Sequence, residues 1–269
     1  MEKDILMIDL PQYCVEYSDK KYSYSPGIGR ENLKKALYKA GRNYCMYCYN
    51  RIKIDKNEYG HLEHAIEASI APEKLRNCVP NIGIACPVCN DKYKKVGEKQ
   101  RVPDCQDVDF FKKEADCKKE FCKKPCKAYQ QLKRAYLRRS DAQFLMQPLG
   151  VNAKDIGIAG TRALRLQYDA LNNTYVPSRR EKYSKKEEDF ILHHIDMFCL
   201  NSLERRSTQM VNFLKDTIQK DGHYAEVEYN NQVVELFVET VLKGKSAEEV
   251  LKICENLYTY VSLKFNIQE

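Results

Sequence analysis

The sequence predicts an α+β protein with a small cysteine-framed core, a basic helical extension and a mostly helical C-terminal region. Three observations support this prediction. Nine of the twelve cysteines lie between Cys45 and Cys126. Strand-like alternation is confined to short segments. The last third of the chain has apolar residues at helical spacing, preceded by recognisable helix starts.

The charge is unevenly distributed along the chain. The 269 residues include 45 basic and 38 acidic side chains, a net charge of +7. Residues 91–140 hold 16 basic and 8 acidic residues, so this segment alone contributes +8. Such a segment is either a solvated helical face or, beside a cysteine cluster, a surface that contacts phosphates. The chain has no long apolar stretch and no signal peptide, which predicts a cytoplasmic protein without a membrane partner.

Short elements precede the cysteine-rich core. Residues 5–10 predict a strand that Pro11 stops, and residues 31–39 predict a helix that ends at Gly41. A basic helix is expected over residues 127–139. The expected organisation is an N-terminal segment at 1–30, a core at 31–103, a basic cysteine-containing helical extension at 104–145 and a mostly helical region for docking or assembly at 146–269.

The C-terminal region should begin with a hairpin. Residues 162–169 alternate as strand residues do, and Asn172-Asn173 can turn the chain back into residues 174–176. Helices should follow, and their apolar stripes predict a core or a face that binds a partner. Three pairs have the spacing of a capping box at a helix start: Ser184 with Glu187, Asn201 with Glu204, and Ser246 with Glu249.

Two C-x2-C pairs give the strongest functional signal: Cys45-Met-Tyr-Cys48 and Cys86-Pro-Val-Cys89. Cysteines in a reducing compartment bind metal more often than they form disulfides. Four thiolates on two tight turns can surround a zinc ion and leave no open position for a substrate. The pattern therefore predicts a structural zinc site. The alternative is two unrelated pairs of reduced cysteines.

The segment between the pairs carries His61-Leu-Glu63-His64 and Asn81, and Asn90 follows the second pair directly. In the order YCMYC, HLEH and NIGIACPVCNDKYK, these residues resemble the HNH nuclease family in its zinc-stapled form. The resemblance implies a zinc-stapled ββα-metal fold for the core. The sequence departs from the commonest family pattern at Ala65-Ile66-Glu67, where the family has an apolar residue followed by proline.

The resemblance also implies a role for each residue. His64 would be the base that deprotonates water, since an imidazole titrates near physiological pH. Glu63 and Asn90 would hold a catalytic Mg²⁺ or Mn²⁺ ion through oxygen atoms. Asn81 would accept the second ring N–H of His64. His61 lies on the same strand face as Glu63 and is a further ligand, a phosphate contact or a residue without function.

A looser resemblance extends over roughly residues 30–215. Phe144-Leu-Met-Gln-Pro148 and Ile195-Asp-Met-Phe-Cys-Leu-Asn201 resemble the PtuB-type HNH proteins of Septu and retron-linked antiviral systems. This resemblance implies the effector nuclease of a bacterial antiphage defence system, with an SMC-like or ABC-type ATPase as its partner. Composition and spacing do not show that partner.

Four more cysteines lie in the basic extension: Cys105, Cys117, Cys122 and Cys126. Their spacing can reach a second zinc ion, and free thiols are the alternative. Phosphate contacts give affinity for nucleic acid without sequence preference. The basic residues expected to make them are Lys92, Lys94, Lys95, Lys123, Lys124, Lys127, Lys133 and Arg134.

The sequence therefore favours a metal-dependent nuclease that hydrolyses phosphodiester bonds of nucleic acid, DNA more than RNA. The alternative is a non-catalytic zinc-ribbon module that binds nucleic acid or a partner protein. Replacement of His64 by alanine separates the two, because the enzyme would lose cleavage while a binding module would lose nothing.

Overall fold

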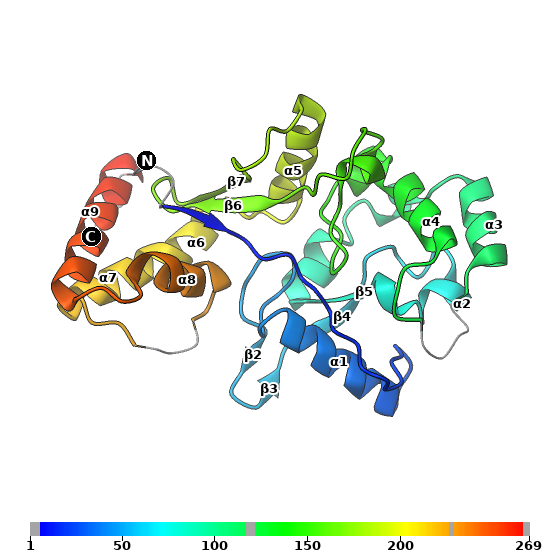
Figure 1. Ribbon diagram of the computed structural model, residues 1–269, viewed down its shortest axis with the longest axis horizontal. Helices are drawn as coiled ribbons and strands as arrows, with labels where there is room; N and C mark the ends of the chain where they lie inside the picture. Colours follow the sequence, from blue (N-terminus) through cyan, green and yellow to red (C-terminus); the bar gives the residue numbers. More distant parts are fainter. Residues whose placement is uncertain (1–5, 117–121, 226–228, 266–269) are drawn as a thin grey trace.

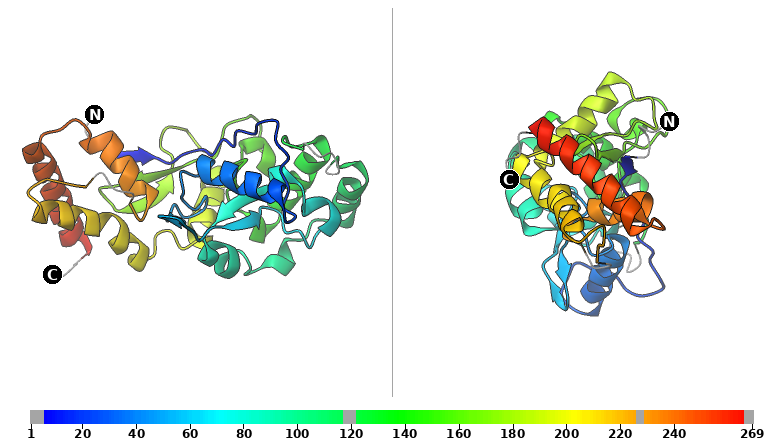
Figure 2. Two further views of the ribbon diagram at one scale, coloured as in Figure 1. Left: turned by 90° about the horizontal axis from the view of Figure 1, so that it is seen from below. Right: turned by 90° about the vertical axis from the view of Figure 1, so that its left-hand side faces the viewer.

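The computed structural model of the chain describes residues 6–116, 122–225 and 229–265. The molecule is elongated and combines helices with three small sheets (Figure 1). The cysteine-rich elements lie at one end, and three C-terminal helices lie at the other. Perpendicular views keep these helices at the same end (Figure 2), so the separation is not an effect of projection. The mixture of helix and sheet agrees with the predicted α+β class.

The cysteine-rich end contains a helix, two short hairpins and a series of short helices. The predicted helices at 31–39 and 127–139 are confirmed, the first with a start three residues earlier. In chain order the elements are α1 (Ile28–Ala40), β2 (Lys53–Ile54), β3 (Asn57–Glu58), β4 (His61–His64), α2 (Pro72–Leu75), η2 (Val79–Asn81), β5 (Ile82–Ala85), η3 (Val88–Tyr93), η4 (Glu98–Arg101), α3 (Cys105–Glu114) and α4 (Lys127–Leu137).

A three-stranded antiparallel sheet joins the beginning of the chain to its second half. Its strands are β1 (Met7–Asp9), β6 (Leu166–Asp169) and β7 (Thr174–Pro177), in the order β1-β6-β7. The predicted N-terminal strand and the predicted hairpin are therefore confirmed, and they pair with each other. The buried apolar residues form one continuous cluster from Ile8 to Leu257.

The C-terminal half is mainly helical, as expected. Its elements are η5 (Ser140–Ala142), η6 (Ala153–Ile156), α5 (Lys185–Met197), α6 (Leu203–Arg206), η7 (Ser207–Val211), α7 (Asn212–Gln219), α8 (Gln232–Phe237), η8 (Val238–Leu242) and α9 (Ala247–Phe265). Within the described ranges, no helix is both long and apolar enough to cross a membrane.

Two of the three predicted capping boxes are confirmed. Ser184 and Glu187 cap α5, and Ser246 and Glu249 exchange side-chain and backbone hydrogen bonds before α9. The third prediction is wrong, because the Asn201 amide bonds to both backbone groups of Tyr175 in β7. A long-range partner on the sheet competes successfully with the local cap.

Candidate metal centre and catalytic site

The hairpin of β4 and β5 carries the predicted site residues. The two strands run antiparallel, with Leu62 opposite Ile84 and Glu63 opposite Gly83. Ile82 and Ile84 are fully buried and fix the hairpin against the core. The short elements α2 and η2 lie between the two strands in the chain, and the short helix η3 follows β5 almost directly.

The two C-x2-C pairs meet at the junction between this hairpin and the helix. All four cysteine sulfurs lie within 4.8 Å of one another, and those of Cys48 and Cys86 are 3.7 Å apart. Sulfurs bound at about 2.3 Å to one zinc ion lie about 3.8 Å apart in a tetrahedron. Cys45, Cys48, Cys86 and Cys89 therefore fit a structural metal ion. They are the only cluster of three or more such ligands within the described ranges.

The surroundings of the cysteine cluster favour negatively charged sulfur at Cys86 in particular. Hydrogen bonds from Cys45, and then from Cys48 and Cys89, lower the pKa of the Cys86 thiol, whereas burial raises the pKa of the Cys45 and Cys89 thiols. Burial opposes the charge of Arg205, but Cys48 and Cys89 raise the pKa of this arginine above its ordinary value. A zinc ion bound to four thiolates carries a net negative charge, which the nearby Arg205 guanidinium partly offsets.

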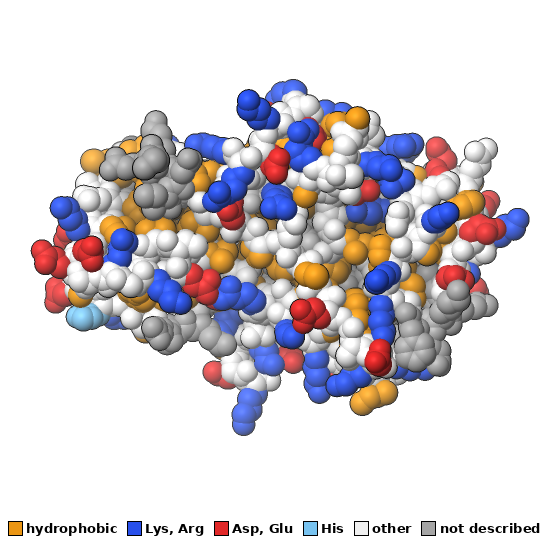
Figure 3. Space-filling view, viewed as in Figure 1, with side chains coloured by type: hydrophobic (Ala, Val, Ile, Leu, Met, Phe, Trp, Pro, Cys, Tyr) orange, Lys and Arg blue, Asp and Glu red, His pale blue; other side chains and the backbone are white. Residues whose placement is uncertain are grey.

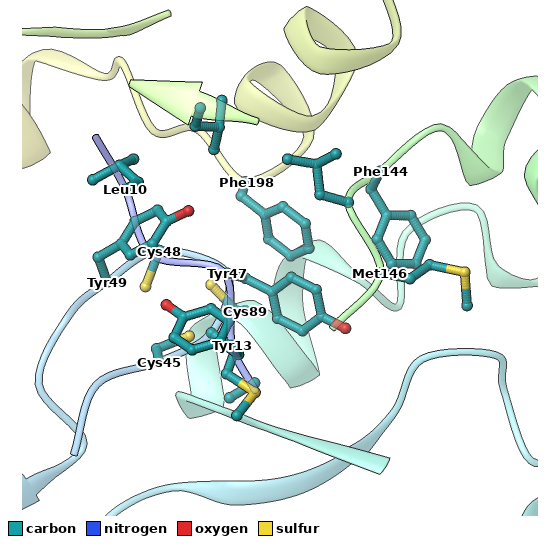
Figure 4. Close-up of a cluster of buried hydrophobic side chains, with 14 of the residues drawn as sticks. Leu10, Tyr13, Cys45, Tyr47, Cys48, Tyr49, Cys89, Phe144, Met146 and Phe198 are labelled. Atoms are coloured by element: carbon teal, nitrogen blue, oxygen red, sulfur yellow. The ribbon is translucent and has the colours of Figure 1, made fainter. Parts of the chain in front are cut away.

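Aromatic rings enclose the cluster on the side of the C-terminal half (Figure 4). Tyr47, between Cys45 and Cys48 in the chain, stacks on Phe198 with ring centres 4.7 Å apart. Tyr49 stacks on Tyr175 at 5.9 Å. These contacts exclude water from the sulfurs and tie the first cysteine pair to residues that follow α5 and to β7.

His64 ends β4 in a half-buried position. Its Nε2 atom lies 3.2 Å from the backbone oxygen of Arg76. Because a carbonyl oxygen can only accept, Nε2 carries the proton of the neutral ring and Nδ1 keeps the lone pair. The ring packs against Tyr24, with ring centres 4.5 Å apart. Burial lowers the pKa of His64, the hydrogen bond to the Arg76 oxygen and the Glu63 charge oppose this shift, and the charges of Lys94 and Arg76 add to it. The imidazole is therefore neutral at physiological pH.

The predicted contact between Asn81 and His64 is wrong. The Asn81 Oδ1 atom accepts hydrogen bonds from the Ile66 backbone N–H at 2.8 Å and the Tyr129 hydroxyl at 3.0 Å. Its Nδ2 atom donates to the Ile66 backbone oxygen at 2.8 Å. A fully buried amide needs partners for each polar group, and Ile66 supplies two of them. Asn81 therefore fixes the backbone after His64, while the Arg76 carbonyl sets the tautomer of the ring.

Glu63 does not fit a catalytic divalent ion in this arrangement. The side chain is only 1% exposed, and its carboxylate accepts a hydrogen bond from the Tyr47 hydroxyl at 2.6 Å. The other oxygen forms an ion pair with Lys94, which also donates to the backbone oxygen of His64. A carboxylate is buried only when its charge is paired, and Lys94 provides that pairing.

The other predicted ion ligand, Asn90, lies on the more exposed side of the hairpin and helix. Its amide donates a hydrogen bond to Asp91 at 3.0 Å. Asp91 lies 3.3 Å from the His61 ring and 3.2 Å from the Lys95 ammonium group. Asn90 therefore belongs to a solvent-facing polar group, whereas Glu63 is enclosed by protein.

Glu67 explains the departure from the family pattern after His64. Its Oε1 atom accepts two hydrogen bonds from Arg101, at 3.1 and 2.9 Å, and one from the Tyr136 hydroxyl at 2.9 Å. Lys94 lies 3.9 Å from the same carboxylate. Two acids and two bases, Glu63, Glu67, Lys94 and Arg101, are thus buried together. This buried ionic network ties the segment after His64 to residues 94–101.

The predicted second zinc site is not formed by the three of its cysteines that the structure describes. Cys105 is exposed at the start of α3. Cys126 caps α4, where its sulfur accepts a hydrogen bond from the Tyr129 backbone N–H. Cys122 is half-buried and does not join these two in a ligand cluster. Cys117 lies outside the described residues.

The eight basic residues predicted to contact phosphates divide into buried and exposed groups. Lys94 and Lys133 are buried, and Lys133 donates to Asp155 at 2.8 Å, so the predicted phosphate contacts of both are wrong. Arg134 lies 3.7 Å from the same aspartate. Lys123 is half-buried and donates to the Ser18 backbone oxygen. Exposed side chains remain at Lys92, Lys95, Lys124 and Lys127.

Basic side chains are scattered over the face shown in Figure 3 and do not form one continuous stripe there. Tyr24 and Arg76 contact His64 but carry no signal in the sequence, because no motif places residues of separate segments against each other. No protein-family model, curated protein or solved structure matches the chain.

Proposed function

We propose that this protein is a nuclease that hydrolyses phosphodiester bonds of nucleic acid, with His64 as the general base. The hydrogen bond from His64 Nε2 to the Arg76 carbonyl carries the proposal, since it leaves the lone pair on Nδ1. A supporting observation is that the base lies at the end of β4, in a hairpin with β5 that the four-cysteine cluster joins to η3. As the HNH resemblance implies, we propose a requirement for Mg²⁺ or Mn²⁺ and a preference for DNA over RNA.

In the proposed reaction, His64 Nδ1 takes a proton from water while the water oxygen attacks the phosphorus atom. The bond from phosphorus to the leaving sugar oxygen breaks, and that oxygen takes a proton from solvent. Asn81 positions His64 indirectly through its two hydrogen bonds to Ile66. A divalent ion would neutralise charge on the phosphate. Glu63 is paired with Lys94, so we assign it no ligand role.

One observation favours the second candidate, a non-catalytic zinc module that binds nucleic acid or a protein. The residue that should hold a catalytic ion, Glu63, is buried and neutralised by Lys94. The four-cysteine cluster and the hairpin would serve such a module equally well. The two candidates differ in whether His64 is needed for an activity.

The test is cleavage of plasmid DNA and of RNA with Mg²⁺ or Mn²⁺, at matched zinc content. The variants are His64→Ala and, as a control, His223→Ala. His223 is exposed and follows α7, at the end of the molecule opposite the cysteine-rich elements (Figure 1), so its loss should leave the His64 ring undisturbed. Cleavage that is lost in His64→Ala and kept in His223→Ala supports the nuclease. Equal cleavage by wild type and His64→Ala contradicts it.

The biological setting rests on the motif resemblance alone. We propose an effector role in bacterial antiphage defence, with an SMC-like or ABC-type ATPase as the partner. Co-purification of the chain with such an ATPase, and phage resistance that depends on His64, would test this role. A nuclease that cleaves without any ATPase and gives no phage resistance would contradict it.

A further inference from the structure

We propose that Arg30 and Arg76 hold the phosphate backbone of the nucleic acid beside His64, and that the loop over residues 23–25 places Arg30 there. This inference rests on the proposed function and names residues outside the HNH motif. Arg30 belongs to the first turn of α1, and Arg76 follows α2 directly. The His64 site is therefore assembled from three separate segments of the chain.

The loop that carries Tyr24 is fixed against the segment after α2. The Asn77 Oδ1 atom accepts hydrogen bonds from the Ser23 hydroxyl at 3.1 Å, the Ser25 backbone N–H at 3.3 Å and the Ser25 hydroxyl at 3.1 Å. The loop closes on α1 through the Ser23 N–H, which donates to the Gly29 oxygen at 3.1 Å. Tyr24, between the two serines, is thereby held against the His64 ring.

Arg30 is positioned by Tyr24 and not by an acid. Its Nη1 atom donates to the Tyr24 backbone oxygen at 2.7 Å, and its guanidinium carbon lies 4.8 Å from the centre of the Tyr24 ring. Such a stacked guanidinium keeps donors for a further ligand, because one guanidinium has five N–H groups. Arg30 therefore contacts Tyr24, and Tyr24 in turn contacts His64.

Arg76 makes a second contact with the His64 ring, through its backbone. Its backbone oxygen accepts the His64 hydrogen bond, and its guanidinium charge acts on the same ring. The side chain is exposed. Within residues 6–116, 122–225 and 229–265, neither Arg30 nor Arg76 forms an ion pair with an acidic side chain. Two guanidinium groups without an acidic partner, one on the Tyr24 ring and one on the residue that bonds to His64, are suited to an anionic ligand.

The ligand chemistry is that of a phosphate backbone and not of a stacked base. The Tyr24 ring already contacts both the Arg30 guanidinium and the His64 ring, so it acts as a scaffold. Arginine contacts to phosphates give affinity and salt dependence without sequence preference. The proposed surface should therefore bind nucleic acids of different sequence with similar strength.

The experiment measures binding of fluorescein-labelled DNA and RNA oligonucleotides by anisotropy, over a range of salt and without divalent ions. The variants are Arg30→Gln, Arg76→Gln and their combination. Lys245→Gln serves as a control of equal charge change, because Lys245 is exposed between η8 and α9 at the opposite end of the molecule (Figure 1). Arg76 and Lys245 are exposed and Arg30 is half-buried, so circular-dichroism spectra of the variants that match the wild type serve as the folding control.

Each arginine variant should lower the slope of log affinity against log salt by about 1, and the double variant should bind about tenfold more weakly. Lys245→Gln should bind as wild type does. Arginine variants that bind no more weakly than Lys245→Gln would overturn the inference. The His64→Ala cleavage test fails or succeeds independently, because binding is measured without turnover.

Discussion

Replacement of Lys94 by methionine should destabilise the protein strongly, although the sequence predicts this lysine at the surface. Lys94 and Glu63 are 5% and 1% exposed, and the lysine is the cation paired with the Glu63 carboxylate. Removal of one partner of a buried ion pair leaves an unpaired charge in a medium of low polarity. We therefore expect a loss of about 3–5 kcal/mol in the free energy of unfolding.

Urea unfolding followed by circular dichroism at constant zinc measures this loss. Lys95→Met is the matched control, because Lys95 is exposed and its pair with Asp91 spans one helical turn. That variant should lose no more than about 0.5 kcal/mol. The double variant Glu63→Gln/Lys94→Met removes both charges and should recover at least about 1 kcal/mol relative to Lys94→Met.

Two results would refute this reasoning. One is a Lys94→Met variant that loses no more stability than Lys95→Met, which would place Lys94 in solvent. The other is a double variant no more stable than Lys94→Met. That outcome would assign the loss to the contacts of Lys94 with the His64 backbone or with Glu67, and not to the Glu63 charge.

Three further predictions concern the metal, the dependence of stability on pH, and the hydrogen bond from Tyr129 to Asn81. Cys86→Ser should remove the bound zinc, measured as metal content per chain, whereas Cys105→Ser should keep it; equal zinc in both variants contradicts the cluster. Burial lowers the pKa of His194 to about 3, so the unfolded chain binds a proton that the folded chain does not. Stability should therefore fall by up to about 5 kcal/mol as the pH drops from about 6.5 towards 3. His194→Gln should show a smaller fall, and an unchanged slope would contradict the assignment. Tyr129→Phe removes a buried hydrogen bond to Asn81 and should cost about 1–2 kcal/mol in urea unfolding; a neutral effect would mean that Asn81 is held without it.

Local patterns predicted the parts of the fold that depend on neighbouring residues. Each C-x2-C pair brings its own two sulfurs together in one local turn. A single long-range contact, between the two turns, then completes the four-cysteine cluster. The capping box of Ser184 and Glu187 forms within four residues. The hairpin of β6 and β7 follows from alternation and the turn at Asn172-Asn173. The capping box and the hairpin have their stabilising partners within a few residues, and each cysteine pair forms its own local turn, so sequence spacing is informative in all three cases.

The partners of individual polar side chains could not be predicted. Lys94 lies in a lysine-rich segment that is typical of a solvated face, yet it is buried in an ion pair with Glu63 on β4. Asn81 and Asn201 bond to backbone groups of Ile66 and Tyr175, which no motif indicates. A buried polar group takes the partner that the tertiary fold brings within reach, and that choice leaves no local signal.

The cysteine cluster also joins the two ends of the molecule, so the predicted core at residues 31–103 is bonded to the C-terminal helices. The Asn231 amide donates to the Cys48 backbone oxygen at 3.2 Å, and the Gln232 N–H donates to the Tyr49 oxygen at 2.9 Å. The first cysteine pair is therefore bonded directly to the start of α8. A metal ion that fixes this turn also fixes the docking site of the C-terminal helices. The four-cysteine cluster is accordingly part of one continuous core, and a metal ion bound there would stabilise contacts far beyond the hairpin that carries His64.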